Sequence, residues 1–151
     1  WARDTMGITL YEWLQQLYVK YGFFREGLVN VVRKGKDGAA EIQQMMVDYR
    51  QNPPKELLGS PVVKILDYKT LEELDVRSGE RRPIEGIDDK SNVLQWLTED
   101  GTKVSVRPSG TEPKIKFYFG VKAKLDSVDK FDEMLVMLDQ KIADIAKELN
   151  L

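Results

Sequence analysis

The residues of this chain best suited to chemistry form one short run, Arg107-Pro108-Ser109-Gly110-Thr111-Glu112-Pro113-Lys114. Ser109 and Thr111 supply hydroxyl donors, and Gly110 lets the backbone approach a ligand closely and turn its amides toward it. The planar guanidinium of Arg107 can hold a phosphate through two charge-assisted hydrogen bonds. The composition of the run therefore predicts a binding site for an oxyanion.

An ordinary solvated hairpin loop is the alternative interpretation of this run, because turns are commonly built from Pro, Ser, Gly and Thr. The neighbouring charges favour the anion site. Arg107, Lys114 and Lys116 crowd one edge and repel one another unless an anion lies among them. Glu112 is the only acidic residue between positions 103 and 122, so positive charge is concentrated beside the run.

Composition excludes several kinds of function. The 151 residues include no Cys and no His, so disulfides, thiolate nucleophiles, Cys/His zinc sites and histidine-based catalysis are absent. The net charge is −2 and the sequence pI is near 5.3, so we expect no nucleic-acid partner. No stretch approaches the roughly 20 apolar residues that cross a bilayer, so we expect no membrane partner either.

The first residues, WARDTMG, lack the basic start and apolar run of a secretory signal. We expect them to be an internal part of a longer protein. Because nothing in the sequence argues for secretion, a cytoplasmic location is the expectation that follows.

Alternating hydrophobicity predicts the strands that position the run. Residues 114–121 alternate cleanly, and their apolar face consists of Ile115, Phe117, Phe119 and Val121. Residues 92–98 and 102–106 are typical of two more strands, joined by a tight turn at Glu99-Asp100-Gly101, because Asp and Gly both tolerate positive φ. The run at 107–114 therefore joins two antiparallel strands.

The first part of the chain is expected to hold a helix and an extended segment. Thr9 and Glu12 form a capping-box pair at the start of the helix, and Gly22 ends it. Residues 23–32 are rich in aromatic and β-branched types and are expected to be extended. The glycine-rich and charged residues 34–38 that follow indicate an exposed link.

Two further helices are predicted later in the chain. One begins at Gly38 or Ala39 and ends before the prolines of Asn52-Pro53-Pro54. The other covers residues 128–149, with Ser127 as its N-cap. Between them, residues 62–68 are expected to form a strand, and the polar residues 69–91 a loop with at most a short strand.

The order of these elements predicts an α+β fold. We expect an antiparallel sheet of about four strands covered by two helices, preceded by the first helix and its extended segment. The glycine-rich link places a boundary near residue 36.

The run RPSGTEPKIKFY resembles the phosphate-binding loop in the last domain of the α-D-phosphohexomutases, the family of phosphoglucomutase, phosphomannomutase and phosphoglucosamine mutase. The segment LYEWLQQLYVKYGFF resembles the end of that family's third domain. SNVLQWLTEDGTKVSVRPSGTEPK is most similar to the phosphoglucomutase/phosphomannomutase branch. The resemblance implies that residues 1–36 are the end of domain 3 and a linker, and that residues 37–151 are the C-terminal phosphate-binding domain, with its TBP-like architecture.

In that family, a phosphoryl group moves between the 1- and 6-positions of a hexose through a bisphosphorylated intermediate. The reactive phosphoserine, the Mg²⁺ loop and the sugar-recognition loop belong to the first three domains. The resemblance therefore implies no catalytic residue and no metal ligand here, and inactivity of this chain alone, with Mg²⁺ needed by the full-length enzyme. Its implied partners are the upstream domains of the same chain and a phosphosugar, namely a glucose or mannose phosphate or a hexose 1,6-bisphosphate.

Carried over residue by residue, the resemblance implies that the phosphate not being transferred is held by Arg107, Ser109, Gly110 and Thr111. Lys114 and Lys116 are possible secondary contacts. We interpret Tyr118 and the Trp13/Tyr18 stripe as packing residues rather than as platforms for a sugar.

A non-enzymatic anion- or partner-binding α+β module remains the alternative, because similar small sheets occur in many binding domains. Such a module would show no preference for sugar phosphates over sulfate or nucleotides. A preference for sugar phosphates would therefore separate the two interpretations.

Overall fold

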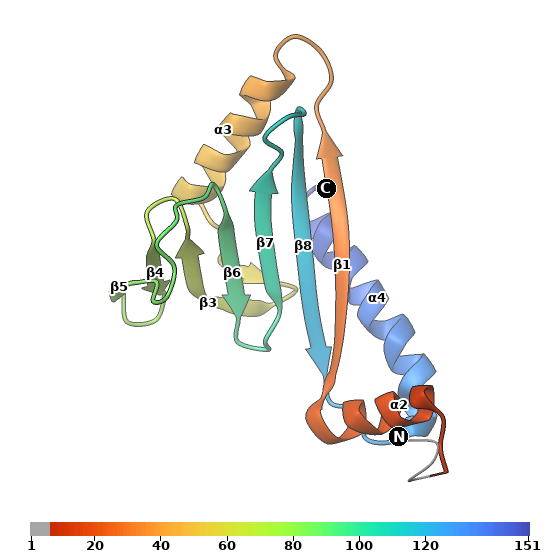
Figure 1. Cartoon of the computed structure of the whole chain (residues 1–151). Coiled ribbons are helices and arrows are strands. Elements are labelled where there is room, and N and C mark those ends of the chain that lie inside the picture. The colour runs from red at the N-terminus through yellow and green to blue at the C-terminus, as the bar shows by residue number, and fades with distance from the viewer. Residues whose placement is uncertain (1–6) are drawn as a thin grey trace.

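An antiparallel sheet of eight strands forms the centre of the computed structural model, which describes residues 7–151 (Figure 1). The spatial order is β1-β8-β7-β6-β3-β4-β5, and β2 pairs with β3 alone. The strands are β1 (Phe23–Val32), β2 (Glu56–Leu57), β3 (Ser60–Asp67), β4 (Glu72–Asp75), β5 (Arg81–Pro83), β6 (Leu94–Thr98), β7 (Lys103–Pro108) and β8 (Lys114–Ala123). The α+β class is confirmed, but the expected number of about four strands is too low.

Two of the additional strands, β4 and β5, lie where the sequence predicts mainly a loop. They are short and carry mostly charged residues, so no apolar alternation marks them. Asp75 organises the turn between them by accepting hydrogen bonds from the amides of Arg77 and Ser78 at 2.9 and 3.0 Å. The pairing thus depends on turn chemistry and backbone hydrogen bonds rather than on a buried face.

Strand β1 forms one edge of the sheet. It pairs with β8 in antiparallel register over its whole length, from Phe23 opposite Ala123 to Val32 opposite Lys114. The extended segment expected before residue 36 therefore lies in the same sheet as the strands that follow it. The domain boundary near residue 36 stays a prediction.

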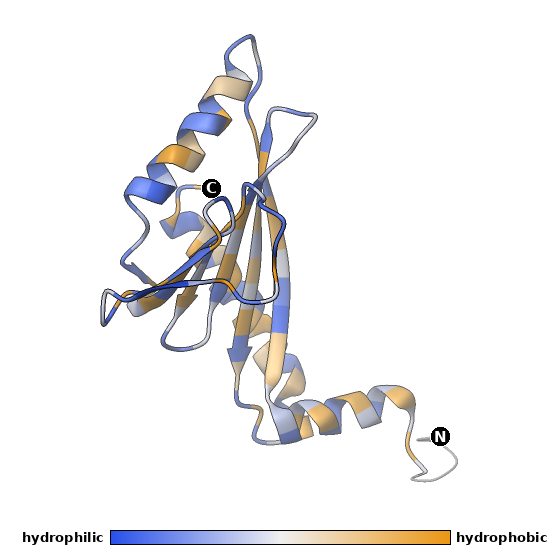
Figure 2. Ribbon diagram, turned by 60° about the vertical axis from the view of Figure 1, so that its left-hand side comes forward, coloured by the Kyte–Doolittle hydropathy of each residue, from blue (hydrophilic) through white to orange (hydrophobic). Residues whose placement is uncertain are grey.

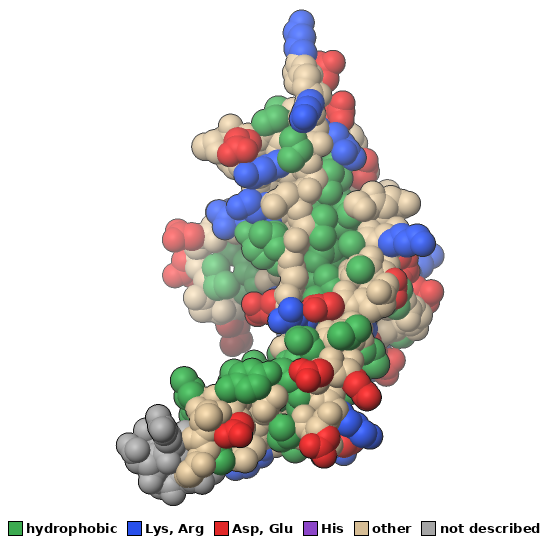
Figure 3. Space-filling view, turned by 90° about the vertical axis from the view of Figure 1, so that its right-hand side faces the viewer, with side chains coloured by type: hydrophobic (Ala, Val, Ile, Leu, Met, Phe, Trp, Pro, Cys, Tyr) green, Lys and Arg blue, Asp and Glu red, His purple; other side chains and the backbone are tan. Residues whose placement is uncertain are grey.

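The helices are α2 (Leu10–Tyr21), α3 (Gly38–Gln51), a 3₁₀ turn η1 (Val128–Lys130) and α4 (Phe131–Glu148). The capping box of α2 is confirmed, since the Glu12 amide donates to Thr9 Oγ1 and the Thr9 amide donates to Glu12 Oε2, at 3.1 and 2.7 Å. Helix α2 extends away from the lower end of the sheet (Figure 2). Its Leu10 side chain is exposed, and Figure 3 shows hydrophobic side chains on the surface at this lower end of the molecule. The expectation for WARDTM lies outside the described residues.

Helical structure begins at Val128, as predicted, but as the 3₁₀ turn η1, and the predicted capping role of Ser127 is wrong. Ser127 is extended and its side chain makes no capping hydrogen bond. The 3₁₀ turn η1 lies between Ser127 and the first α-helical residue, Phe131, so the serine is one turn too early to reach the free amides of α4. The buried ring of Phe131 packs against Phe23 at 4.9 Å between centroids and anchors that end of α4.

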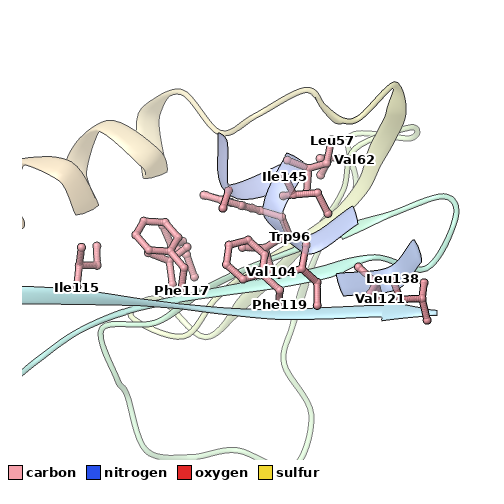
Figure 4. Close-up of a cluster of buried hydrophobic side chains, with 14 of the residues drawn as sticks. Leu57, Val62, Trp96, Val104, Ile115, Phe117, Phe119, Val121, Leu138 and Ile145 are labelled. Atoms are coloured by element: carbon pink, nitrogen blue, oxygen red, sulfur yellow. The ribbon is translucent and has the colours of Figure 1, made fainter. Parts of the chain in front are cut away.

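The core lies between one face of the sheet and helices α3 and α4. The alternation predicted for β8 is confirmed, because Ile115, Phe117, Phe119 and Val121 are each at most 2% exposed. Trp96 of β6 packs beside Tyr49 of α3, with 5.2 Å between ring centroids. Figure 4 shows these side chains projecting from the sheet toward the helices, together with Leu138 and Ile145 of α4. The opposite face of β1, β8 and β7 carries no helix in the described part of the chain (Figure 1).

Candidate anion-binding site

The predicted site is the hairpin loop between β7 and β8, at the upper end of the sheet (Figure 1). Backbone hydrogen bonds fix its two ends: the Ser109 amide donates to the Lys114 carbonyl at 2.9 Å, and the Lys114 amide donates to the Glu112 carbonyl at 2.8 Å. The Arg33 amide, just after β1, donates to the Pro113 carbonyl at 2.9 Å. The loop is therefore held both by its own hairpin and by the neighbouring edge of the sheet.

Arg107 and Lys116 lie directly opposite each other on β7 and β8 and point to the helix-free face. Neither side chain makes a hydrogen bond or ion pair with any residue from 7 to 151. Like charges in directly opposed positions destabilise a sheet, and a bound anion between them reverses the sign of that interaction. This unpaired cation pair is the strongest electrostatic feature of the site. Figure 3 shows Lys and Arg side chains at this upper end of the molecule, interspersed with Asp and Glu.

Only some of the amide and hydroxyl groups at the tip of the loop make hydrogen bonds within the loop. Ser109 Oγ accepts from the amides of Thr111 and Glu112, but at the long distances of 3.4 and 3.3 Å. The Gly110 amide and the Thr111 hydroxyl have no partner among the described residues. A Cβ atom built on Gly110 would meet nothing within 4 Å, so the space in front of this residue is open. Ser109 thus shapes the tip, whereas Gly110 and Thr111 offer free donors.

Lys114 differs from the other cations of the site. Its Nζ lies 3.2 Å from Glu112 Oε2, so part of its charge is neutralised within the loop. Sequence reasoning placed Lys114 and Lys116 together as possible secondary contacts. The structure leaves only Lys116 of these two unpaired.

Sequence reasoning missed Asn30, which lies opposite Lys116 on the other side of β8. The side chains of Asn30, Lys116 and Arg107 therefore form one row across three strands on the helix-free face. No local pattern could identify Asn30, because its position depends on pairing between β1 and β8, which are far apart in sequence.

Two of the tyrosines that we expected to be packing residues, Tyr18 and Tyr118, lie in different environments. Tyr18 packs as expected, with its ring 4.8 Å from Phe23 and 6.0 Å from Phe131 between centroids. Tyr118, in contrast, lies on the helix-free face, is 40% exposed and has no ring partner in residues 7–151. Tyr118 therefore lies outside the aromatic cluster that contains Tyr18, opposite Leu28 of β1.

Across residues 7–151, no group of three or more acidic side chains is placed to hold a metal ion. No helix in the same range is long and apolar enough to cross a membrane.

Comparison with known families identifies the relatives of this chain. The family described as "Phosphoglucomutase/phosphomannomutase, C-terminal domain" matches residues 28–138, which include the whole loop and both of its strands. The chain belongs to this family. The resemblance noted in the sequence is thereby confirmed.

Curated relatives agree with this membership. A phosphoglucomutase of Staphylococcus aureus (strain MRSA252) is 37% identical over 116 residues, which are 77% of this chain and 20% of the relative. A phosphoglucomutase of Staphylococcus saprophyticus is 32% identical over 131 residues, 87% of this chain and 22% of the relative. The chain thus spans about a fifth of the length of these relatives.

A comparison of structures aligns 92% of this chain with 23% of the crystal structure of pp63/parafusin, a phosphoglucomutase from Paramecium. The TM-score is 0.47 and the sequence identity is 16%.

Proposed function

We propose that this chain is the substrate-phosphate-binding domain of a phosphoglucomutase/phosphomannomutase that interconverts hexose 1-phosphate and hexose 6-phosphate. The loop Arg107–Lys114 holds the phosphate that is not being transferred. The observation that carries the proposal is the opposed, unpaired pair of Arg107 and Lys116 beside a loop with free donors at Gly110 and Thr111.

Each group has a distinct task in this proposal. The Arg107 guanidinium grips two phosphate oxygens, and the ammonium of Lys116 adds a point charge from the opposite strand. Gly110 contributes its amide and Thr111 its hydroxyl. Ser109 holds the amides of the tip and can still donate its own hydroxyl proton to the phosphate.

Phosphate anchoring contributes to catalysis by positioning. A hexose phosphate must present first one end and then the other to the group that transfers the phosphoryl unit. A fixed anchor for the distant phosphate converts binding energy into correct orientation of the reacting hydroxyl. Because Arg107, Lys116 and the loop donors all recognise phosphate rather than the sugar, the anchor serves both orientations of the substrate.

The described residues do not fit a Mg²⁺ site, because no cluster of carboxylates among them is placed to hold one. We therefore assign no step of the reaction to a metal in this chain. Mg²⁺ and the phosphorylating group belong, in this proposal, to the remaining domains of a longer cytoplasmic enzyme, and this chain alone is inactive.

Titration of the chain with glucose 6-phosphate, followed by backbone amide NMR, tests the proposal. We expect shifts centred on residues 107–114 and an affinity in the millimolar range, about 4 kcal/mol of binding free energy, because one domain supplies only part of the contacts. Arg107→Ala should abolish the shifts. Arg82→Ala is the matched control, because Arg82 is exposed and pairs with Glu80 far from the loop.

Two results would count against the assignment. If the amides of residues 107–114 stay unchanged while others shift, the site is elsewhere. If sulfate, nucleotides and glucose 6-phosphate bind equally well at the loop, the alternative of a general anion-binding module is favoured.

A further inference from the structure

The helix-free face of the sheet contains a hollow below the proposed phosphate site. Its volume is about 160 Å³, far more than the space a single water needs. The hollow exists because Gly120 of β8 has no side chain, while its neighbours on both adjacent strands do. Glu26 of β1 and Lys103 of β7 lie directly opposite Gly120.

The side chains around the hollow are polar and uncommitted. The hollow is lined by the side chains of Glu26, Lys103, Ser105 and Tyr118. None of these four side chains makes a hydrogen bond or ion pair within residues 7–151. Here a carboxylate acceptor, an ammonium donor, a hydroxyl and an aromatic ring remain free around one depression.

The mixture of groups restricts what can bind. The carboxylate of Glu26 disfavours an anion in the hollow, and the ammonium of Lys103 disfavours a cation. A neutral ligand with several hydroxyl groups satisfies both, because each hydroxyl can donate to the carboxylate and accept from the ammonium. The apolar face of Tyr118 suits the C–H face of a sugar ring. The chemistry of the hollow is therefore that of a sugar site.

Strand register places the hollow within reach of the phosphate site. Tyr118 and Ser105 form the row next to Lys116 and Arg107 on the same face, and Gly120 lies in the row after that. Two residues along a strand span about 7 Å. A hexose whose phosphate lies between Arg107 and Lys116 can thus lay its ring over Tyr118, with its far hydroxyls directed into the hollow.

We propose that the hollow lined by Glu26, Lys103, Ser105 and Tyr118 is a sugar subsite that binds the hydroxyl groups of the hexose phosphate held at the loop. This inference rests on the proposed function of the loop. The subsite adds to the sugar-recognition loop that the family resemblance implies in another domain. It gives this domain a way to prefer sugar phosphates over inorganic phosphate.

Parallel NMR titrations with inorganic phosphate and glucose 6-phosphate separate the two proposals. Inorganic phosphate should shift the loop amides only, whereas glucose 6-phosphate should also shift the amides of Ser105, Tyr118 and Gly120. Loop shifts with both ligands but no additional shifts with glucose 6-phosphate would overturn the subsite and leave the loop function intact. Absence of loop shifts with either ligand would overturn both.

Variants of the hollow sharpen the test. Tyr118→Ala removes the ring, and Gly120→Val fills the depression; a Cβ at Gly120 makes only ordinary contacts with Lys103 at 3.9 Å, so the fold should tolerate it. Each variant should weaken glucose 6-phosphate binding about three- to tenfold and leave inorganic phosphate binding within about twofold. Tyr118→Phe should retain most of the affinity, because the ring remains.

Phe24→Ala is the matched control, since Phe24 is an exposed aromatic residue on the same face but does not line the hollow. It should change neither affinity. Circular dichroism confirms that each variant is folded. Unchanged glucose 6-phosphate affinity in both folded variants, Tyr118→Ala and Gly120→Val, would overturn the subsite.

Discussion

The turns at the two ends of β7 differ in whether their charged side chains are paired within the fold. At the lower end, the turn after Thr98 is closed by its own hydrogen bonds and by helix α4. Asp100 accepts from the Thr102 amide at 3.0 Å and from Lys141 Nζ at 2.6 Å, and its own amide donates to Ser60 Oγ at 3.2 Å. At the upper end, Arg107 and Lys116 have no partner in residues 7–151.

The pKa of Asp100 reflects how many hydrogen bonds its carboxylate accepts in the turn after Thr98. Burial of the carboxylate by itself raises its pKa. The hydrogen bonds from Lys141, Thr98 and Thr102 outweigh that cost, however, and hold the pKa of Asp100 well below its usual range. The carboxylate is therefore charged at neutral pH and locks the turn onto α4.

The contrast separates a turn that is paired within the fold from the loop that we propose binds phosphate. Both contain Ser or Thr, Gly and charged residues, so their compositions look alike. The lower turn satisfies its charge with an opposite charge from the fold, whereas the upper one opposes two like charges and leaves them open to solvent. Stability is expected to depend on the first and ligand binding on the second.

The largest expected effect is that of Arg107→Ala, at the upper end of β7, on catalytic efficiency. In the longer enzyme that we propose, Arg107→Ala should lower kcat/KM by about 30- to 150-fold, as expected for the loss of a charge-assisted phosphate contact worth about 2–3 kcal/mol. Its thermal midpoint should stay within a degree or two of the parent, because Arg107 stabilises no other side chain. Steady-state kinetics and calorimetry measure the two quantities. Parent-like kinetics would remove the anchor role.

Asp100→Asn is expected to have the next largest effect, on stability alone. Loss of the charged hydrogen bonds should lower the free energy of unfolding of this chain by about 1–2 kcal/mol and leave phosphate binding unchanged. Denaturant unfolding measures the first quantity and NMR titration the second. Asp89→Asn is the control, since Asp89 is exposed and unpaired in the described residues.

The same substitution has a pH signature. Because the folded-state pKa of Asp100 is depressed, its contribution is fully present above the pKa of an unfolded aspartate, near 3.9, and is lost as pH falls through the folded-state value. The stability difference between the parent and Asp100→Asn should therefore be constant from pH 5 to 8 and shrink below about pH 4. A difference that instead grows in acid would contradict the assigned hydrogen bonds.

The effect of Lys116→Ala on the free energy of unfolding should change sign when phosphate is bound. Without an anion, removal of the charge opposite Arg107 relieves repulsion and should raise the free energy of unfolding by a few tenths of a kcal/mol. With phosphate present, the affinity should fall about threefold, because an opposed cation is lost. Unfolding curves with and without saturating phosphate test both signs. Destabilisation in the absence of anion would show that Lys116 has a structural partner.

Gly110→Ala should have the smallest effect. Its φ is not positive, and a Cβ there meets nothing within 4 Å, so stability should change by less than about 0.5 kcal/mol. Phosphate affinity should fall measurably only if the ligand approaches the Gly110 amide closely. Unchanged affinity would confine the site to the Arg107/Lys116 row and the hydroxyl groups.

Local patterns determined several parts of this protein. The alternation of residues 114–121 was sufficient to predict the buried face of β8, since side chains on a strand must alternate between two faces. The Thr9 and Glu12 pair predicted the start of α2 for the same kind of reason: both hydrogen bonds lie within one helical turn. The oxyanion interpretation of the loop also came from residue types alone, and it stays a prediction for the titration to test.

Local patterns failed where nonlocal contacts decided the structure. Ser127 has the right type for a cap, but the 3₁₀ turn and the buried Phe131 set the start of α4. The tight turn after Thr98 is present as predicted, with Gly101 at positive φ, but the contacts of Asp100 with Ser60, Thr102 and Lys141 had no local signal. The charged strands β4 and β5 offered no apolar alternation to detect.

By itself, the sequence thus determined the secondary-structure class and the core face of the central strand, because each depends on residues within a few positions of one another. The residue types of the loop led to the oxyanion hypothesis in the same local way. The tertiary structure alone decided which side chains stand beside that loop. The long-range pairing of β1 with β8 brings Asn30 and Glu26 to the helix-free face, and pairing of β7 with β8 opposes Arg107 to Lys116. Strand register is a property of segments that meet only on folding, so no local pattern records it.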